Sequence, residues 1–434
     1  MLDIRYIRQN PELVAEKSKQ KGYPVDILKL LELDEQRRQL LAEVEDLRAK
    51  RNELASELKS KKPGPDKIEQ GRKLRDQLDK VAKRLAPIDE QYLVRLKAVP
   101  NMPETDVPVG TSEDDNKVAK QWGDKPKFDF KPKNHWEIAE ARGWIDKERA
   151  AKVAGSRFAY IKGDLARLQF ALIQWAIEKL TDEKIIKKIL SESGVAASSK
   201  PFIPIVPPAM IHTDVYEAMD RLEPSDDRYK VGTDDDNLWL QGSAEHTLGP
   251  MYMKEILKSE DLPIRYLGYA TSFRREAGSY GKDAEGIFRM HQFDKLEMES
   301  FTGPNDGRNE HLFLIAIQEH LMRQLKLPYQ VLLKCTADIG KPNARGVDLE
   351  AWLPGQSAYR ETHTADYMTD YQTRRLGTKV KSGAEEVVFA HTNDATAIAL
   401  GRTMIAIIEN YQNKDGSVNL PTVLQPYMSG KTKI

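Results

Sequence analysis

The residues best suited to chemistry lie in segment 272–301, which reads SFRREAGSYGKDAEGIFRMHQFDKLEMESF. Arg274 and Glu276 are expected on a strand, a glycine-containing turn follows, and Arg289 and Phe293 lie on the returning side. Arginine offers a rigid fork of donors to phosphate oxygens, and an aromatic ring can stack on a purine. Glycines allow such a turn to close over a ligand. The segment therefore fits a nucleoside triphosphate site, while its composition alone also fits a charged surface β-hairpin.

Composition restricts the class of protein that can position these residues. The 434 residues include 67 basic and 67 acidic side chains, so contact with a polyanion must come from local basic patches. The length predicts two or three domains. No run of about 18 apolar residues occurs, so no membrane span is expected. The single cysteine, Cys335, excludes an intrachain disulfide and fits a reducing, cytoplasmic setting.

A pair of long helices is predicted over residues 28–98, which are poor in glycine and rich in Leu, Glu, Lys and Arg. Between the helices, Pro63, Gly64 and Pro65 form a breaker. Two helices joined in this way should fold back as an antiparallel coiled-coil hairpin roughly 50 Å long. Apolar residues at steps of three, four and seven predict its seam. They are Leu33, Leu40, Val44, Leu47, Leu54, Leu58, Leu74, Leu78, Val81, Leu85, Ile88 and Tyr92.

The outer faces of this hairpin are rich in basic residues, which allow two interpretations. Interspersed acids favour a solvated coiled coil with ion pairs between its helices. The alternative is an arm whose cations contact RNA phosphates. The basic residues are Arg37, Arg38, Arg48, Arg51, Lys59, Lys61, Lys62, Arg72, Lys73, Arg75, Lys83 and Arg84.

The run FRREAGSYGKD followed by RMHQFDKLE resembles motif 2 of the class II aminoacyl-tRNA synthetases in its seryl form. FIPIVPPAMI, with Pro207 and Pro208, resembles motif 1, and ATAIALGRTMIAIIENYQ at 395–412 resembles motif 3. Together with the helical arm, these motifs make the chain similar to a seryl-tRNA synthetase of bacterial type over essentially its full length.

This resemblance implies an α+β fold, in which helices flank an antiparallel sheet in the catalytic domain. The expected division is a tRNA-binding domain over 1–103 with its arm at about 28–98, a linker over 104–132 and a catalytic domain over 133–434. The expected assembly is a homodimer. The implied substrates are ATP with Mg²⁺, L-serine, tRNA(Ser) and, where it exists, tRNA(Sec).

The implied reaction has two steps. The serine carboxylate first attacks the α-phosphate of ATP and pyrophosphate leaves; the terminal hydroxyl of the tRNA then attacks the seryl-adenylate. By resemblance, Arg274 holds the α-phosphate and the serine carboxylate, and Glu276 contacts the adenine edge or the acceptor end. Arg289 is assigned to the outer phosphates, Met290 lies beside the nucleotide, and Phe293 stacks under adenine, with simple core packing as its alternative.

Three further residues complete the implied nucleotide site. Arg402 lies in an otherwise apolar helix, where a guanidinium needs a partner. A bound γ-phosphate or a core carboxylate could be that partner, and the family assigns ATP. A carboxylate and a hydroxyl three residues apart, Glu361 and Thr364, could share one magnesium ion that bridges the phosphates.

Serine selection is assigned by resemblance to Ser243, Glu245, Glu297 and Thr396. Glu245 would accept from the substrate ammonium, while Glu297 and Thr396 would bind the substrate hydroxyl. Alanine would be rejected because it would leave these buried polar groups unpaired.

One departure from the family concerns Asp394. The family commonly has HTLNGS before the motif 3 helix, whereas this chain has HTNDAT, so Asp394 replaces an asparagine. Either Asn393 moves in to serve, or Asp394 points at the substrate ammonium or a neighbouring arginine. The sequence leaves these alternatives open.

Two rival functions remain at this point. A ligase that loads an amino acid onto a carrier protein would lack the helical arm, so residues 28–98 argue against it. A non-catalytic RNA-binding paralogue is opposed by the retention of Arg274, Glu297, Glu361 and Arg402.

Overall fold

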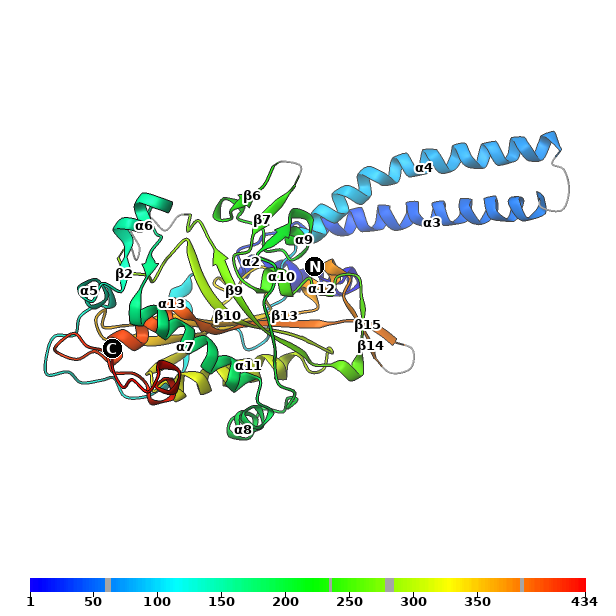
Figure 1. Ribbon diagram of the computed structural model, residues 1–434. Coiled ribbons are helices and arrows are strands. Elements are labelled where there is room, and N and C mark those ends of the chain that lie inside the picture. Colours follow the sequence, from blue (N-terminus) through cyan, green and yellow to red (C-terminus); the bar gives the residue numbers. More distant parts are fainter. Residues whose placement is uncertain (59–63, 234–235, 278–284, 383–385) are drawn as a thin grey trace. The chain divides into compact units, whose positions relative to one another are not determined.

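The computed structural model describes residues 1–58, 64–233, 236–277, 285–382 and 386–434 (Figure 1). The chain separates into two compact units, Met1–Met102 and Pro103–Ile434. In the part that the structure describes, no helix combines the length and apolar character needed to cross a membrane.

The smaller unit is entirely helical, with α1 (Ile4–Gln9), α2 (Pro11–Gln20), α3 (Ile27–Leu58) and α4 (Pro65–Ala98). As predicted, α3 and α4 form a long antiparallel hairpin (Figure 1). Gly64 is the N-cap of α4 and Pro65 is its first residue, where a missing N–H costs nothing. The Leu58 side chain and residues 59–63, including Lys59, Lys61, Lys62 and Pro63, lie outside the described residues. The seam consists of Leu40, Val44, Leu47, Leu54, Leu74, Leu78, Val81, Leu85 and Ile88.

Ion pairs and exposed cations coexist on the arm. Arg37 pairs with Asp89 and Arg84 with Glu43, and both pairs connect the two helices. The side chain of Arg84 is 65% exposed, so this pair contributes little stability. Several other cations of the predicted RNA-binding set are also exposed. They include Arg48, Arg51, Arg72, Lys73, Arg75 and Lys83.

The larger unit is built on an eight-stranded sheet in the order β1-β11-β12-β13-β16-β10-β9-β4. All neighbouring strands are antiparallel except β4, which runs parallel to β9. The predicted α+β class is thereby confirmed. The strands are β1 (Lys117–Trp122), β4 (Ile203–Ile205), β9 (Ile264–Phe273), β10 (Gln292–Thr302), β11 (Tyr329–Leu333), β12 (Arg345–Leu353), β13 (Ala358–Thr369) and β16 (His391–Ala399).

Helices α7 (Gly163–Leu180), α11 (Gly307–Gln324) and α13 (Leu400–Asn410) pack with the sheet around one large core. Leu296 and Met298 of β10 belong to this core. Side chains alternate along a strand, so Lys295, Glu297 and Glu299 point to the opposite face. Polar residues of β10 therefore gather on the face away from the main core, where the site lies.

Smaller elements surround this framework. The short helices are α5 (His135–Ala141), α6 (Lys147–Ala154), α8 (Glu183–Ser193), α9 (Thr213–Ala218), α10 (Glu245–Leu248) and α12 (Tyr371–Leu376). The short strands are β2 (Ile145–Asp146), β3 (Tyr160–Ile161), β5 (Met210–His212), β6 (Lys230–Val231), β7 (Leu238–Leu240), β8 (Ile256–Lys258), β14 (Lys379–Ser382) and β15 (Glu386–Phe389).

The structure ends one expected strand early and places the two prolines of motif 1 at a break between short strands. Arg274 and Glu276 follow β9, which ends at Phe273, and Glu276 adopts a left-handed φ of 52°. The motif 1 strand is interrupted, because Pro207 and Pro208 fall between β4 and β5. Proline lacks the N–H that a strand ladder uses, which explains the break.

The segment predicted as a linker also contains a strand. β1 lies within 104–132 and extends the sheet by pairing with β11. Its burial is slight, so no alternating apolar pattern marked it in the sequence.

Candidate active site

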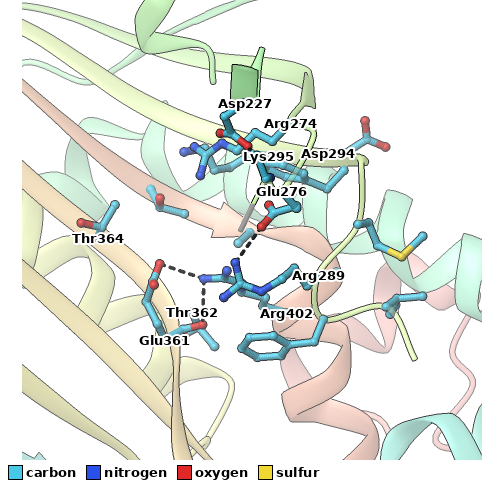
Figure 2. Close-up of a pocket in the computed structure, with 18 of the residues that line it drawn as sticks. Asp227, Arg274, Glu276, Arg289, Asp294, Lys295, Glu361, Thr362, Thr364 and Arg402 are labelled. Atoms are coloured by element: carbon cyan, nitrogen blue, oxygen red, sulfur yellow. Dashed lines mark hydrogen bonds and ion pairs between the residues drawn. The ribbon is translucent and has the colours of Figure 1, made fainter. Parts of the chain in front are cut away.

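The β9–β10 connection borders a cavity of about 710 Å³ together with β10, β13, β16 and the start of α13 (Figure 2). The predicted nucleotide residues line it together, although they come from three separate regions of the sequence. Thr396 and Lys295 also line it. The tip of the connecting turn, residues 278–284 with Gly278 and Gly281, lies outside the described residues. The lining residues predicted for the nucleotide are Arg274, Glu276, Arg289, Met290, Phe293, Glu361, Thr364 and Arg402.

Arg274 is held in place by backbone contacts on both sides. Its N–H donates to the His291 carbonyl at 3.0 Å, which continues the β9–β10 pairing. Its Nε donates to the Gly242 carbonyl at 3.1 Å, and its guanidinium carbon lies 5.4 Å from the Phe293 ring centroid. Across the cavity mouth, Arg289 Nη1 donates to Glu276 Oε2 at 2.6 Å. Two guanidinium groups thus face one cavity beside an aromatic ring.

Arg402 enters the cavity from the first turn of α13. Its Nη1 donates to Glu361 Oε1 at 2.8 Å and to the Glu361 carbonyl at 3.2 Å (Figure 2). Its guanidinium carbon also lies 4.8 Å from the Phe288 ring centroid, within cation–π range. Of the two partners considered from the sequence, the structure shows a carboxylate, and this carboxylate is open to the cavity.

A β-bulge brings Glu361 and Thr364 to the same side of β13. Residues three apart on a regular strand point to opposite faces. Here Glu350 pairs with Glu361 and Leu349 pairs with His363, so Thr362 is an extra residue. Glu361 and Thr364 therefore both line the cavity.

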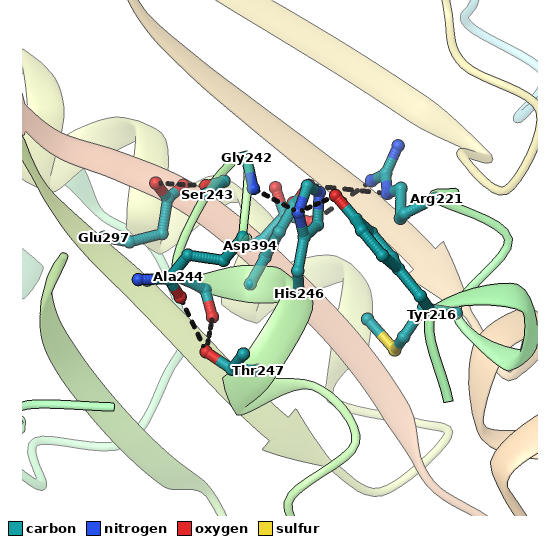
Figure 3. A network of polar contacts seen from close by, with 12 residues as sticks. Tyr216, Arg221, Gly242, Ser243, Ala244, His246, Thr247, Glu297 and Asp394 are labelled. Atoms are coloured by element: carbon teal, nitrogen blue, oxygen red, sulfur yellow. Dashed lines mark hydrogen bonds and ion pairs between the residues drawn. The ribbon is translucent and has the colours of Figure 1, made fainter. Parts of the chain in front are cut away.

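The residues predicted for serine selection form a buried network next to the cavity (Figure 3). Ser243 Oγ donates to Glu297 Oε2 at 3.1 Å, and Lys295 forms an ion pair with the same carboxylate. Glu297 is 1% exposed, and burial raises its pKa against the opposing charge of Lys295. A second bulge, at Ala397 of β16, pairs Thr396 with Glu297. The Thr396 hydroxyl on β16 and the Glu297 carboxylate on β10 thus belong to directly opposed residues of adjacent strands.

Glu245 is held by two neighbours. Gly242 N–H donates to His246 Nδ1 at 3.0 Å, so the proton of the neutral imidazole is on Nε2. That nitrogen lies 3.1 Å from Glu245 Oε1 and donates to it. Burial lowers the pKa of His246 to about 4, which keeps it neutral near pH 7. Arg221 Nε lies 3.5 Å from the same carboxylate oxygen (Figure 3).

Asp394 contacts a neighbouring arginine, Arg221, which is one of the alternatives left open by the sequence. Arg221 Nη2 lies 3.4 Å from Asp394 Oδ2. Asn393 does not take over, because its Nδ2 donates to the Gly307 carbonyl at 3.1 Å. Asp394 therefore points at a neighbouring arginine. Arg221 was not among the predicted site residues, because it belongs to no motif in the sequence.

Glu299 is a second residue that sequence reasoning missed. It pairs across the strands with Asp394 and is 1% exposed. Burial and the charge of Glu245 raise its pKa well above the usual value. Its position two residues after Glu297 on the same face of β10 was the available signal.

Comparison with known proteins supports the class that this architecture suggests. Residues 1–103 match the profile described as "Seryl-tRNA synthetase N-terminal domain". Residues 229–411 match the profile "tRNA synthetase class II core domain (G, H, P, S and T)". The antiparallel sheet, the β9–β10 hairpin and the arginine of α13 are those of a class II aminoacyl-tRNA synthetase.

Full-length relatives then define the family. The chain is 39% identical over 440 residues to "Serine--tRNA ligase" of Citrifermentans bemidjiense, with 100% of both chains covered. It is 35% identical to that of Nitrosopumilus maritimus, also with 100% of both covered. The chain belongs to the seryl-tRNA synthetase family, and it is an enzyme that uses ATP to attach serine to tRNA.

Solved structures of seryl-tRNA synthetases have the same fold over the whole chain. The enzyme from Pyrococcus horikoshii, complexed with ATP, has a TM-score of 0.87 and 34% identity, covering 100% of this chain and 99% of its own. The cytoplasmic enzyme from Naegleria fowleri, in complex with AMP, has a TM-score of 0.84 and 29% identity, with 100% and 98% covered.

Proposed function

We propose that the cavity between the β9–β10 hairpin and α13 binds ATP in an orientation set by its arginines. Arg274 contacts the α-phosphate and the serine carboxylate, and Arg289 contacts the outer phosphates. Phe293 stacks under adenine with Met290 beside it, and Glu276 contacts the adenine edge or the acceptor end of the tRNA. The contact that supports this proposal most is the cation–π pair of Arg274 and Phe293. In this pair, the arginine that would bind phosphate lies next to the ring that would stack on adenine.

Arg402 is assigned to the terminal phosphate from the opposite wall. Positive charge placed in advance stabilises the negative charge that develops as the carboxylate attacks phosphorus and pyrophosphate leaves. These groups act by position and charge, so a covalent enzyme intermediate is not needed.

Glu361 and Thr364 are the proposed ligands of Mg²⁺. Glu361 and Thr364 both line the cavity, and a carboxylate and a hydroxyl are oxygen donors of the kind that Mg²⁺ prefers. Within the described residues, no cluster of three or more His, Cys, Asp or Glu side chains could hold a metal by itself. ATP phosphates would therefore supply the other ligands, and the ion would neutralise phosphate charge.

The buried network beside Lys295 is the proposed serine site. Glu245 accepts from the substrate ammonium, while Glu297 and Thr396 bind the substrate hydroxyl and Ser243 orients Glu297. Glu297 already accepts from Ser243 at 3.1 Å, which fixes its orientation before serine arrives. Asp394 lies next to Glu245 through their shared contact with Arg221 and shapes the ammonium end.

The experiment that tests the assignment is serine-dependent pyrophosphate exchange. Exchange should occur with serine and be at least about 100-fold weaker with alanine, because alanine leaves buried polar groups unpaired. Glycine should behave like alanine, and threonine should be rejected less strongly. Equal exchange with alanine and serine would contradict the assignment of Glu297 and Thr396.

The domain roles complete the proposal. The domain at 1–103 binds tRNA through its arm at about 28–98, residues 104–132 connect it to the rest, and residues 133–434 catalyse the reaction. The tRNA is tRNA(Ser) and, where a cell makes it, tRNA(Sec). The enzyme acts in the cytoplasm, where tRNA is charged. It works as a homodimer through motif 1, since Ile203, Val206 and Met210 are 55%, 78% and 49% exposed near the sheet edge.

The role of the arm has its own test. Replacing Arg72, Lys73 and Arg75 with glutamine in one variant should raise the KM for tRNA, because phosphate contacts are lost. The other kinetic parameters should stay unchanged. Exchange without tRNA should remain unchanged. Lys187→Gln with Lys188→Gln, which neutralises exposed cations outside the arm, is the control. Deletion of residues 35–92 should abolish charging and leave most of the exchange activity; equal loss of both would contradict a separate arm.

A further inference from the structure

The segment that opens α5 contains a buried histidine whose two ring nitrogens contact separate parts of the active-site framework. His135 is 0% exposed, as is Glu409 in the last turn of α13. Glu409 Oε1 lies 3.1 Å from both the backbone nitrogen and Nδ1 of His135. Glu409 Oε2 accepts from the Gly355 N–H at 2.9 Å, in the turn between β12 and β13. Glu409 thus joins α13, α5 and this turn.

The other ring nitrogen fixes the tautomer of His135. The Ile287 N–H donates to His135 Nε2 at 3.3 Å. A backbone N–H can only donate, so Nε2 must hold the lone pair and the proton must be on Nδ1, where Glu409 accepts it. The neighbouring Gly286 has φ of 68°, and a Cβ there would lie 1.9 Å from Nε2. The backbone therefore approaches the imidazole more closely than any residue other than glycine would allow.

This contact holds the part of the hairpin that faces the nucleotide. Ile287 directly precedes Phe288 and Arg289, both of which line the cavity. The Phe288 ring lies 4.8 Å from the Arg402 guanidinium and 4.1 Å from that of Arg360. A shift at Ile287 would therefore move two residues that contact the phosphate-binding groups.

We infer that His135 is a positioning residue for ATP: held by Glu409 in its Nδ1-protonated form, it fixes the returning side of the β9–β10 turn against α13. The inference rests on the proposed nucleotide site. The competing explanation is structural only, with His135 serving to satisfy the buried Glu409 carboxylate. Positioning of the turn requires Nε2, which accepts from Ile287, whereas the structural explanation requires only Nδ1, which contacts Glu409. Substitutions that replace one nitrogen at a time can therefore separate them.

Glutamine and asparagine form the matched pair of variants. His135→Gln can place an acceptor near the position of Nε2, facing Ile287. His135→Asn can place a donor near the position of Nδ1, facing Glu409, and leaves Ile287 N–H buried without its partner. In pyrophosphate exchange, the Asn variant should raise the KM for ATP about tenfold, as loss of one buried hydrogen bond implies. The Gln variant should stay within about threefold of the wild type, and the KM for serine should change little in either.

Hydrogen–deuterium exchange gives a readout that does not depend on activity. Amide exchange in a peptide covering 285–290 should be faster in the Asn variant and remain slow in the Gln variant. His320→Asn is the control, because His320 is also buried and paired with a glutamate, Glu192, away from the cavity. The inference would be overturned if the Asn variant matched the wild type in both the KM for ATP and the protection of amides from hydrogen–deuterium exchange. It would also be overturned if the Gln variant were as impaired as the Asn variant.

The two proposals can fail separately. Absence of serine-dependent pyrophosphate exchange in the wild type would refute the nucleotide site. Protection of the Ile287 amide from hydrogen–deuterium exchange would still report on the contact with His135. Nitrogen-15 NMR of the intact wild-type protein provides the test if neither variant folds. The Nδ1-protonated neutral form of His135 is expected, and an Nε2-protonated form would overturn the inference.

Discussion

At the scale of single residues, the unusual feature of this site is the group of carboxyls around Arg221. Carboxyl oxygens of Glu245 and Asp394 lie 3.5 Å and 3.4 Å from Arg221, and Glu299 lies opposite Asp394. Burial tends to raise the pKa of Glu245, but the charge of Arg221 and the hydrogen bond from His246 hold it well below the usual value. Burial instead raises the pKa of Asp394 well above its usual value, assisted by the charge of Glu245. Arg221 therefore keeps Glu245, the proposed acceptor of the substrate ammonium, ionised.

Arg221→Gln should make serine binding dependent on pH. Without the guanidinium, the pKa of Glu245 rises, so more of it is protonated as the pH falls and the substrate ammonium loses its acceptor. The KM for serine should rise by up to about tenfold for each unit that the pH falls below the new pKa of Glu245, and it should recover as the pH is raised. The wild type should show a nearly flat KM over the same pH values, and the measurement is pyrophosphate exchange against serine concentration.

Asp394→Asn provides the double-mutant comparison. In the Arg221→Gln background, the asparagine amide can still donate to Glu245 but cannot ionise beside it, so part of the affinity for serine should return. The coupling between the two changes should be about 0.5–3 kcal/mol, as for residues in contact. Independent, additive effects of the two substitutions would show that Arg221 does not act through this group.

Arg274→Ala tests the phosphate contact itself. Loss of one guanidinium from the transition state should reduce the exchange rate by about 100-fold or more. The thermal unfolding temperature should change little, because Arg274 is only partly buried. Arg275→Ala is the matched control, since Arg275 is the exposed neighbour and its Nε donates to the Arg228 carbonyl at 2.9 Å. Undiminished exchange in Arg274→Ala would refute the assigned role.

At the scale of elements, two bulges determine which residues meet. Thr362 is the extra residue of β13 and Ala397 that of β16. The first places Glu361 and Thr364 on one face, and the second places Thr396 opposite Glu297. Bulges are not visible as a residue pattern, so the spacing Glu-x-x-Thr would by itself have argued against a shared site on a regular strand.

Deletion of Thr362 should therefore abolish exchange. A one-residue change in the register of a strand sends the following side chains to the opposite face, and Thr364 would leave the cavity. Thr362→Ala keeps the residue count and loses the hydroxyl contacts to the Leu349 carbonyl and to His363 Nδ1, so it should cost about 1–3 kcal/mol of stability while retaining exchange activity. The measurement is exchange activity against Mg²⁺ concentration. Retained activity in a folded deletion variant would contradict the role of the bulge.

At the scale of the whole molecule, the proposed homodimer can be tested at β4, where Ile203 is 55% exposed. Ile203→Glu should yield monomers with reduced exchange activity, because a charge would be buried at the motif 1 interface. Val153→Glu is the control, since Val153 is a 75% exposed residue of α6. Light scattering after gel filtration measures the mass. A dimer that persists in Ile203→Glu would place the interface elsewhere.

The arm was predictable in detail because its stabilising contacts are local and periodic. Every residue of the seam in the structure belongs to the stripes read from the sequence, such as Leu47 and Val81. The long-range sheet was predictable mainly as a class. Strand β1 was missed because it is exposed, and the end of β9 at Phe273 was missed because Arg274 pairs with His291 only through its backbone.

The sequence by itself determined the reaction class. The arginines, the aromatic ring and the carboxylates occur within motifs whose residue types and order can be read directly along the chain. Tertiary structure alone decided how their charges are balanced. Arg221 reaches Asp394 across 173 positions, and His135 reaches Ile287 across 152. Such contacts depend on how strands, helices and turns pack, and no local periodicity encodes them.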